Sequence, residues 1–303
     1  MKYVIVIPAK NEAEGISVTI DSILSQTLLP ESVLVLDDGS TDQMRSVIEH
    51  YMAKSSLIQY YFNEQSETTY VLGGKIVKLF LKGKSLIDSQ NIEYDFIVKM
   101  DADIRFGPQF MEAIALKVKS DNFGIVSGTP FAIENDRKVF IISPEWHTNG
   151  DFKIYNRKFL ESSENFPKDL GWDCADNLLA IEKGFSTAAF RDINYEQNRP
   201  IGRFSSKKGR KRQGLGAYKL GYSWSYLTLK VLHDLVKPPF ITGSWFYLSG
   251  YFEGKLKKMP KTVNHNQQKL LRKLMWQSFS QRLKNRNFFI FQLFSNTSQS
   301  GKA

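Results

Sequence analysis

The chain of 303 residues has a single cysteine, Cys174, which excludes a framework of internal disulfide bonds. One lone thiol is typical of a protein from a reducing compartment. The longest uncharged run of its aromatic part, Pro238 to Phe252, has 15 residues and is too short to cross a bilayer as a helix. No leader-like stretch opens the chain, because Met1 and Lys2 run straight into a strand-like segment. We therefore expect a cytoplasmic protein without a spanning helix.

Acidic residues are nearly missing from the last third of the chain. Residues 200–303 contain 20 Lys and Arg residues against only Asp234 and Glu253, a net charge of +18. Residues 1–199 carry 21 Lys and Arg against 29 Asp and Glu, a net charge of −8. Such a split predicts two functional regions, of which the second faces something anionic: a membrane, a phosphate group or a nucleic acid.

Short apolar runs alternate with helical patterns through the first two hundred residues. Tyr3–Ile7 and Val33–Leu36 are continuous apolar runs typical of buried parallel strands, and Ile16–Leu24 between them has helical spacing. This alternation predicts an α/β fold with right-handed crossovers. Further strands are expected at 57–62, 96–98, 124–127, 139–142 and 185–190.

Two carboxylates, Asp101 and Asp103, directly follow the expected strand Phe96–Val98. Residues i and i+2 at a strand end point to the same side, so both side chains can meet one ligand. Mg²⁺ and Mn²⁺ prefer such oxygen ligands and take the rest of their shell from phosphates and water. Taken alone, an Asp-x-Asp sequence after a strand is more typical of a solvated turn than of a metal site. Open α/β sheets, however, bind ligands at their strand ends, and the other motifs of the chain favour a site.

Polar motifs also follow the other expected strands. Pro8–Glu12 follows the first strand, and Asp37–Asp42, which can equally be a simple turn, follows the second. Gly73-Gly-Lys75 opens an expected helix. Glycines before a helix let the backbone approach a phosphate, and Lys75 adds positive charge.

Together these motifs resemble the family 2 glycosyltransferases, inverting enzymes of GT-A fold that use nucleotide-sugar donors. The resemblance covers about residues 1–205, and its motifs are weak singly but specific in their joint order. They are Val-Ile-Pro-Ala-Lys-Asn-Glu (6–12), Val-Leu-Asp-Asp-Gly-Ser-Thr-Asp (35–42), Gly-Gly-Lys (73–75) and Met-Asp-Ala-Asp (100–103). The resemblance implies a Rossmann-like, mostly parallel mixed sheet flanked by helices, with a helical, aromatic and basic region after it.

The resemblance also implies roles for the strand-end residues. Asp103 would be the ligand of a Mg²⁺ or Mn²⁺ ion, and Asp101 would contact the donor's ribose or sugar and share the metal. Lys75 either adds charge near the donor or is a solvated lysine at a helix start. The residues expected to bind the nucleotide sugar are Pro8, Ala9, Glu12, Asp38, Lys75, Asp101 and Asp103.

An inverting transfer also needs a general base for the acceptor hydroxyl. Trp172-Asp173, with Gly184 eleven residues after the aspartate, stands where the family usually has Glu-Asp, which implies Asp173 as the base. Asp176, one helical turn on, is the reserve, or else a carboxylate favoured by the helix dipole. Trp172 departs from the family's Glu, and either stacks on a sugar or belongs to the core.

Several other residues have two interpretations each. Cys174 is expected to be a packing residue, because nucleophilic chemistry would need a histidine nearby. His147 is either a substrate contact or an ordinary histidine. Arg199, Gly202 and an expected basic loop at Lys207–Arg212 either close over the diphosphate or stay solvated.

The resemblance implies a catalytic domain, residues 1–205, and the change of composition after residue 199 indicates a separate helical region, residues 206–303. The second contains an aromatic stretch, Tyr218–Phe252, and a basic amphipathic helix over 264–286. Aromatic rings suit the membrane interface and basic residues suit anionic headgroups, so we expect peripheral attachment to the inner face of a membrane. That place would suit a glycan or lipid-linked acceptor of cell-surface polysaccharide synthesis. Packing of the aromatic residues against the catalytic domain is the alternative.

Other functional classes explain less of the sequence. A basic protein that binds nucleic acid or membranes without catalysis would leave the acidic strand-end motifs unexplained, so no nucleic-acid partner is expected. A sugar nucleotidyltransferase expects a Gly- and Arg-rich loop after the first strand, where this chain has Pro8–Glu12. A phosphatase with an Asp-x-Asp nucleophile expects that motif after the first strand as well.

Overall fold

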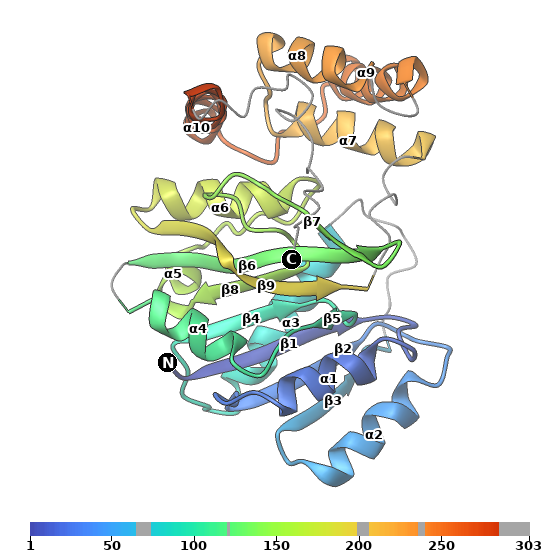
Figure 1. Ribbon diagram of the computed structural model, residues 1–303, viewed down its shortest axis with the longest axis vertical. Coiled ribbons are helices and arrows are strands. Elements are labelled where there is room, and N and C mark those ends of the chain that lie inside the picture. The colour runs from blue at the N-terminus through green and yellow to red at the C-terminus, as the bar shows by residue number, and fades with distance from the viewer. Residues whose placement is uncertain (65–73, 120–121, 199–205, 236–239, 285–303) are drawn as a thin grey trace.

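The computed structural model describes residues 1–303 except 65–73, 120–121, 199–205, 236–239 and 285–303 (Figure 1). The strands of the described part are β1 (Tyr3–Ala9), β2 (Ser32–Asp37), β3 (Ile58–Phe62), β4 (Phe96–Met100), β5 (Ile104–Arg105), β6 (Phe123–Glu134), β7 (Arg137–Phe140), β8 (Phe152–Asn156) and β9 (Ser186–Gln197). Its helices are α1 (Ile16–Leu24), α2 (Met44–Lys54), α3 (Gly74–Asp88), α4 (Phe110–Lys117), α5 (Arg157–Glu161), α6 (Trp172–Glu182), α7 (Lys207–Lys219), α8 (Trp224–Asp234), α9 (Phe240–Leu256) and α10 (His265–Lys284).

One nine-stranded sheet organises the first two hundred residues, in the order β3-β2-β1-β4-β8-β6-β9-β5, with β7 paired to β6. Strands β1 to β4, β6 and β9 run in one direction, and β5, β7 and β8 run against them. The predicted α/β fold with a mostly parallel mixed sheet is confirmed. The crossover helices α1, α2 and α3 connect the parallel strands, as the alternation of patterns requires.

Helices cover both faces of the sheet, and the pleat of β1 shows how. Ile5 and Ile7 lie in a core with helices α1, α2 and α4 on one face, whereas Val4 and Val6 pack with α3, α5 and α6 on the other. All seven residues of β1 are buried. A strand buried on both faces cannot alternate apolar and polar residues, which explains the continuous apolar run.

A group of four helices, α7 to α10, stacks beyond α6 at one end of the sheet (Figure 1). Leu271 and Met275 of α10 pack against Cys174 and Leu178 of α6, so α10 buries one apolar face as its predicted amphipathic pattern requires. Thr262 and Lys219 tie the same region to the segment before α6 through Leu170 and Asp169. The predicted helical C-terminal region is therefore confirmed by helices α7 to α10 in the described part of the chain.

The expected basic loop at Lys207–Arg212 is wrong, because these residues form the first turns of α7. The Ser206 side chain accepts a hydrogen bond from the Gly209 amide and caps the helix. Arg210 pairs with Asp234 at 3.1 Å and Lys211 pairs with Glu253 at 2.8 Å. The two acidic residues of this part of the chain thus each pair with one residue of the basic run, which favours its folding as a helix. The residues expected to act with this loop, Arg199 and Gly202, lie outside the described part.

Glycines allow α7 and α9 to pack with their backbones in close contact. A Cβ atom on Gly214 would lie 1.7 Å from the Tyr247 carbonyl oxygen, and one on Gly250 would lie 1.9 Å from the Lys211 carbonyl oxygen. Neither distance is possible for a real side chain, so both positions require glycine. The glycine face of α9 is consequently buried against α7, whereas Ile241, Trp245 and Leu256 are exposed.

Candidate active site

The motifs after β1, β2 and β4 lie at one edge of the sheet, as predicted for parallel strands. Ala9 is paired with Asp37 in the β1–β2 register, and the Asp38 amide donates to the Ala9 carbonyl oxygen at 2.9 Å. Asn11 joins the two loops beyond this point, because its side chain accepts from the Thr41 amide at 2.8 Å. The predicted nucleotide-binding residues of the first two motifs are thus brought together: Pro8 and Ala9 buried, Glu12 partly buried and Asp38 buried.

Asp38 and Lys75, predicted from separate motifs, form an ion pair at this edge. The other Asp38 oxygen accepts from the Asn63 amide group at 2.9 Å, and Lys82 donates to the Asn63 carbonyl oxygen at 2.8 Å. Asp37, by contrast, is held inside the protein by Tyr60 and the Ser40 amide. Asp37 is therefore occupied by groups of the interior, whereas Asp38 is paired with Lys75 and remains the candidate site residue of the two.

Asp101 and Asp103 follow β4 and differ in their surroundings. Asp101 is ion-paired with Lys99 of β4, and its amide donates to the Asp151 carbonyl oxygen at 2.8 Å. The Asp103 side chain is buried against the start of α1, where a Cβ atom on Gly15 would lie 3.4 Å from its own Cβ. Lys99 thus neutralises Asp101, which is consistent with the assignment of the metal to Asp103 that the resemblance implies.

The donor set fits a Mg²⁺ or Mn²⁺ ion that is shared with a diphosphate. The described residues contain no cluster of three His, Cys, Asp or Glu side chains arranged as a ligand set. The protein therefore offers Asp101 and Asp103, and phosphate and water oxygens must complete the shell. This division is usual for Mg²⁺, which binds one or two carboxylates together with substrate phosphates.

Sequence reasoning missed Asp151, a third carboxylate close to Asp101. Tyr195 donates to its Oδ1 at 2.9 Å, while its Oδ2 is buried without a hydrogen-bond partner. Burial, reinforced by the Asp101 charge, raises the pKa of Asp151 to about 6. The local sequence around Gly150 and Asp151 does not show that this segment packs against the end of β4.

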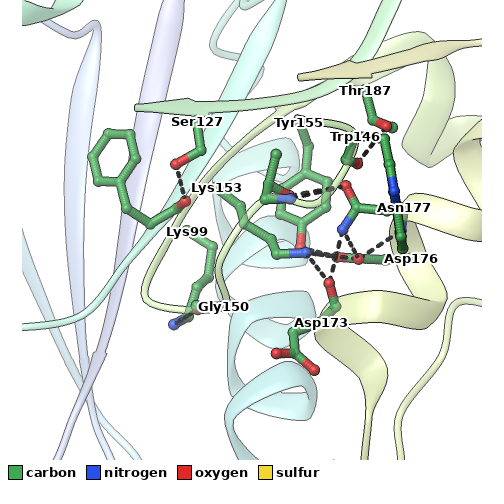
Figure 2. A network of polar contacts seen from close by, with 12 residues as sticks. Lys99, Ser127, Trp146, Gly150, Lys153, Tyr155, Asp173, Asp176, Asn177 and Thr187 are labelled. Atoms are coloured by element: carbon green, nitrogen blue, oxygen red, sulfur yellow. Dashed lines mark hydrogen bonds and ion pairs between the residues drawn. The ribbon is translucent and has the colours of Figure 1, made fainter. Parts of the chain in front are cut away.

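Asp173, the predicted base, lies in the first turn of α6 and is only partly buried. Its carboxylate points away from the polar network formed by Asp176 and Asn177 (Figure 2). Its backbone carbonyl oxygen, in contrast, accepts from Lys153 Nζ at 2.7 Å and from Asn177 Nδ2 at 2.8 Å. The backbone of Asp173 is thus fixed by two hydrogen bonds, while its carboxylate takes no part in the network.

Asp176, the predicted reserve base, is fully buried and has all its acceptor capacity in use. Lys153 donates to its two oxygens at 2.7 and 2.8 Å, and the Tyr155 hydroxyl donates at 2.7 Å (Figure 2). Burial raises the pKa of Asp176 to about 6, although the Lys153 charge opposes the rise. An acceptor hydroxyl would have to displace these partners to reach it.

Trp172, Cys174 and His147 lie near Asp173. Trp172 is 8% exposed and belongs to the core on the α3 side of the sheet, so its second interpretation holds. Cys174 is a buried packing residue as predicted, and burial raises the pKa of its thiol. Burial also lowers the pKa of His147 to about 4, against the opposing effect of the Asp173 carboxylate. A neutral imidazole therefore stands near the expected base at neutral pH.

Two buried lysines, Lys99 and Lys153, were also missed. Each interrupts an apolar strand, between Val98 and Met100 in one case and between Phe152 and Ile154 in the other. A charged residue inside a buried strand is costly unless it has a partner, and this was the available signal.

Comparison of the sequence with known proteins supports one family. Residues 4–70 match the family model described as "Glycosyl transferase family 2". An uncharacterised glycosyltransferase of Mycoplasma genitalium is 24% identical over 168 residues, covering 55% of this chain and 52% of the relative. A cholesterol galactosyltransferase of Borreliella burgdorferi is 24% identical over 180 residues, covering 57% and 47%. The chain thus spans about half the length of these curated relatives.

Solved structures share the fold at low identity. A mannosyltransferase from Pyrobaculum calidifontis, PcManGT, in complex with GDP-Man and Mn²⁺, superposes with a TM-score of 0.53. It is 16% identical, with 97% of this chain and 84% of that chain covered. S. aureus TarS 1-349 in complex with UDP-GlcNAc gives a TM-score of 0.53 at 17% identity, covering 85% and 76%. These comparisons confirm the resemblance and the GT-A-like fold expected from the sequence.

Proposed function

Because residues 4–70 match the model of glycosyl transferase family 2 and the chain has a GT-A-like fold, we propose that it is an inverting transferase of that family. It would move a sugar from a nucleotide-diphosphate donor to a glycan or lipid-linked acceptor of cell-surface polysaccharide. One observation carries this proposal: Asp38 follows β2, Asp101 and Asp103 follow β4, and both strands end on the same side of the sheet, on either side of β1. Asp173 is linked to that side through Lys99 and Gly150.

In the proposed reaction the chain holds the donor along the ends of β1, β2 and β4. Asp38 accepts from the base or ribose, Lys75 adds positive charge beside it, and Asp101 contacts the ribose or sugar. A bound Mg²⁺ or Mn²⁺ ion, held by Asp103 with Asp101, would stabilise the negative charge of the leaving diphosphate.

The acceptor side of the reaction belongs to Asp173. The acceptor oxygen forms a bond to the anomeric carbon while the bond from that carbon to the diphosphate oxygen breaks. The acceptor's proton passes to the Asp173 carboxylate, and the configuration at carbon inverts in this single displacement. Asp173 is preferred to Asp176 because the Asp176 carboxylate is enclosed by Lys153 and Tyr155.

The donor is tested with a panel of nucleotide sugars in the presence of Mn²⁺. One of them is expected to raise the thermal unfolding midpoint, because a ligand that binds only the folded state stabilises it. The solved relatives hold GDP-Man and UDP-GlcNAc, so the panel includes guanine and uracil nucleotides. Asp38→Asn should lose most of the shift, whereas Asp136→Asn, in the exposed turn between β6 and β7, should retain it. Absence of a shift and of donor hydrolysis across the panel would contradict the proposed function.

The exposed apolar face of α9 supports an acceptor that is embedded in a membrane. Ile241, Trp245 and Leu256 are 72, 69 and 80% exposed, and they lie on the side of α9 opposite its contact with α7. Lys255 lies over the exposed Trp224 ring at 4.6 Å, which places a cation beside the apolar surface. An apolar helix face flanked by lysines fits an anionic lipid surface.

Attachment would be peripheral, at the inner face of the membrane. No helix in the described part of the chain has the length and apolar character needed to cross a bilayer. The relative from Borreliella burgdorferi is, by its name, a transferase that acts on cholesterol, a lipid. A lipid-linked acceptor cannot leave the bilayer, so an enzyme held at the surface would meet it directly.

Vesicle co-sedimentation tests this attachment. The chain should sediment with vesicles that contain phosphatidylglycerol, and added salt should weaken the binding because the lysine charges are screened. A triple change, Ile241→Ser, Trp245→Ser and Leu256→Ser, should weaken the affinity for vesicles by about 10²-fold, since each side chain loses about 1 kcal/mol of burial and about 1.4 kcal/mol is a factor of ten. Leu116→Ser is the matched control, because Leu116 of α4 is 63% exposed on the catalytic domain. Equal binding by the triple variant and the wild type would rule out α9 as the membrane-facing element.

A further inference from the structure

Lys99 of β4 and Lys153 of β8 are a pair of buried cations in the middle of the sheet. They are 2 and 0% exposed, and they lie directly opposite each other in the antiparallel β4–β8 register. Residues opposite each other in such a pair project to the same face of the sheet. Two like charges placed together in the interior are unfavourable unless each has its own anionic partner.

Lys153 takes its partners from α6. Its ammonium group donates to both oxygens of Asp176 at 2.7 and 2.8 Å and to the backbone carbonyl oxygen of Asp173 at 2.7 Å. A single buried side chain therefore connects the central sheet to the residue that we propose as the base (Figure 2).

Lys99 takes its partners from the donor side. It pairs with Asp101, and it donates to the Gly150 carbonyl oxygen at 2.5 Å. Gly150 in turn packs against α6, because a Cβ atom there would lie 3.1 Å from Asp173 Cβ and 3.2 Å from the Trp172 ring. Contacts therefore run without interruption from Asp101 to Asp173.

Trp172 completes the arrangement between the two lysines. Its ring lies 5.8 Å from Lys99 Nζ and 5.3 Å from Lys153 Nζ, within the range of cation–π attraction. The position at which the sequence departs from its family, Trp in place of Glu, is thus filled by a ring that packs against both cations. A carboxylate there would compete with Asp101 and Asp176 for the same ammonium groups.

We propose that Lys153, together with Lys99 and Trp172, is a positioning unit that fixes Asp173 relative to the donor-binding Asp101. This inference rests on the proposed function, because it assumes that Asp173 is the base. A displacement of about 1 Å in a reacting group can cost about 10²-fold in rate. Lys153 would therefore act on transfer through the placement of Asp173 without touching either substrate.

The test replaces the buried charge by a side chain of similar length. Lys153→Met should lower kcat by about 10²-fold while the donor KM stays within about threefold, since donor contacts remain. Because this change leaves Asp176 buried without its cation, a second variant, Lys153→Met with Asp176→Asn, removes both charges and protects folding. The kcat loss should persist in the double variant.

Tyr155→Phe is the matched control for a purely structural role. It removes another hydrogen bond to Asp176 inside the same network but leaves the Lys153 contact with Asp173 intact. It should lower the unfolding midpoint and leave kcat within about threefold of the wild type. The positioning role would be overturned, with the proposed function left standing, by either of two results. One is a wild-type kcat in the double variant, and the other is an equal loss of kcat in the double variant and in Tyr155→Phe. A wild-type chain that turns over no donor would instead overturn the proposed function, and the inference with it.

Discussion

Asp103→Ala is expected to abolish metal-dependent transfer, with a fall in kcat/KM of about 10³-fold. Stabilisation of a leaving diphosphate by a cation contributes several kcal/mol, and each 1.36 kcal/mol is a factor of ten in rate. Asp103 should dominate over Asp101 because the Asp101 carboxylate is already paired with the buried Lys99. Asp101→Asn should therefore cost less than Asp103→Ala.

Binding distinguishes this loss from misfolding. The nucleoside diphosphate of the preferred donor should bind the wild type more tightly with Mn²⁺ than with chelator, and Asp103→Ala should lose that difference in calorimetry. Thermal unfolding of the variant without ligand checks that it is folded at the assay temperature. The metal role would be disproved if Asp103→Ala, assayed with chelator present, were nearly as active as the wild type with Mn²⁺.

The sheet and its strand-end motifs could be predicted from the sequence because their signals are local. Tyr3–Ile7 is apolar throughout since β1 is buried on both faces, and Ile16–Leu24 has the bounds of α1. The register of parallel strands then places Asp38 beside Ala9 without further information. The same local logic located Asp101 and Asp103.

The helix at Lys207–Arg212 could not be predicted, because its stability comes from distant residues. A run of basic residues is unfavourable as an isolated helix, since like charges repel at helical spacing. Asp234 and Glu253, on α8 and α9, reduce that repulsion by pairing with Arg210 and Lys211. Local sequence contains no sign of this pairing.

The difference between the two candidate bases could not be predicted from the sequence for a similar reason. Asp173 and Asp176 are three residues apart on one helix and look equivalent in the sequence. They differ only because β8 brings Lys153 and Tyr155 to Asp176 and leaves the Asp173 carboxylate uncovered. The choice between the two is therefore a matter of tertiary structure.

Asp173→Asn should lower transfer by about 10²-fold to 10⁴-fold, because asparagine keeps the shape of aspartate but cannot accept the acceptor's proton. The loss should appear in kcat, with donor affinity within a few-fold of the wild type, since Asp173 makes no proposed contact with the nucleotide. Single-turnover kinetics with saturating donor measures this directly.

Asp176→Asn provides the comparison on the same helix. The change leaves Lys153 without its buried counter-ion, so the unfolding midpoint should fall clearly, whereas Asp173→Asn should leave it nearly unchanged. At a temperature where both variants are folded, Asp176→Asn should retain more activity, because Lys153 still holds the Asp173 carbonyl oxygen. The opposite ranking, with Asp173→Asn active and Asp176→Asn inactive but folded and able to bind donor, would transfer the role of base to Asp176.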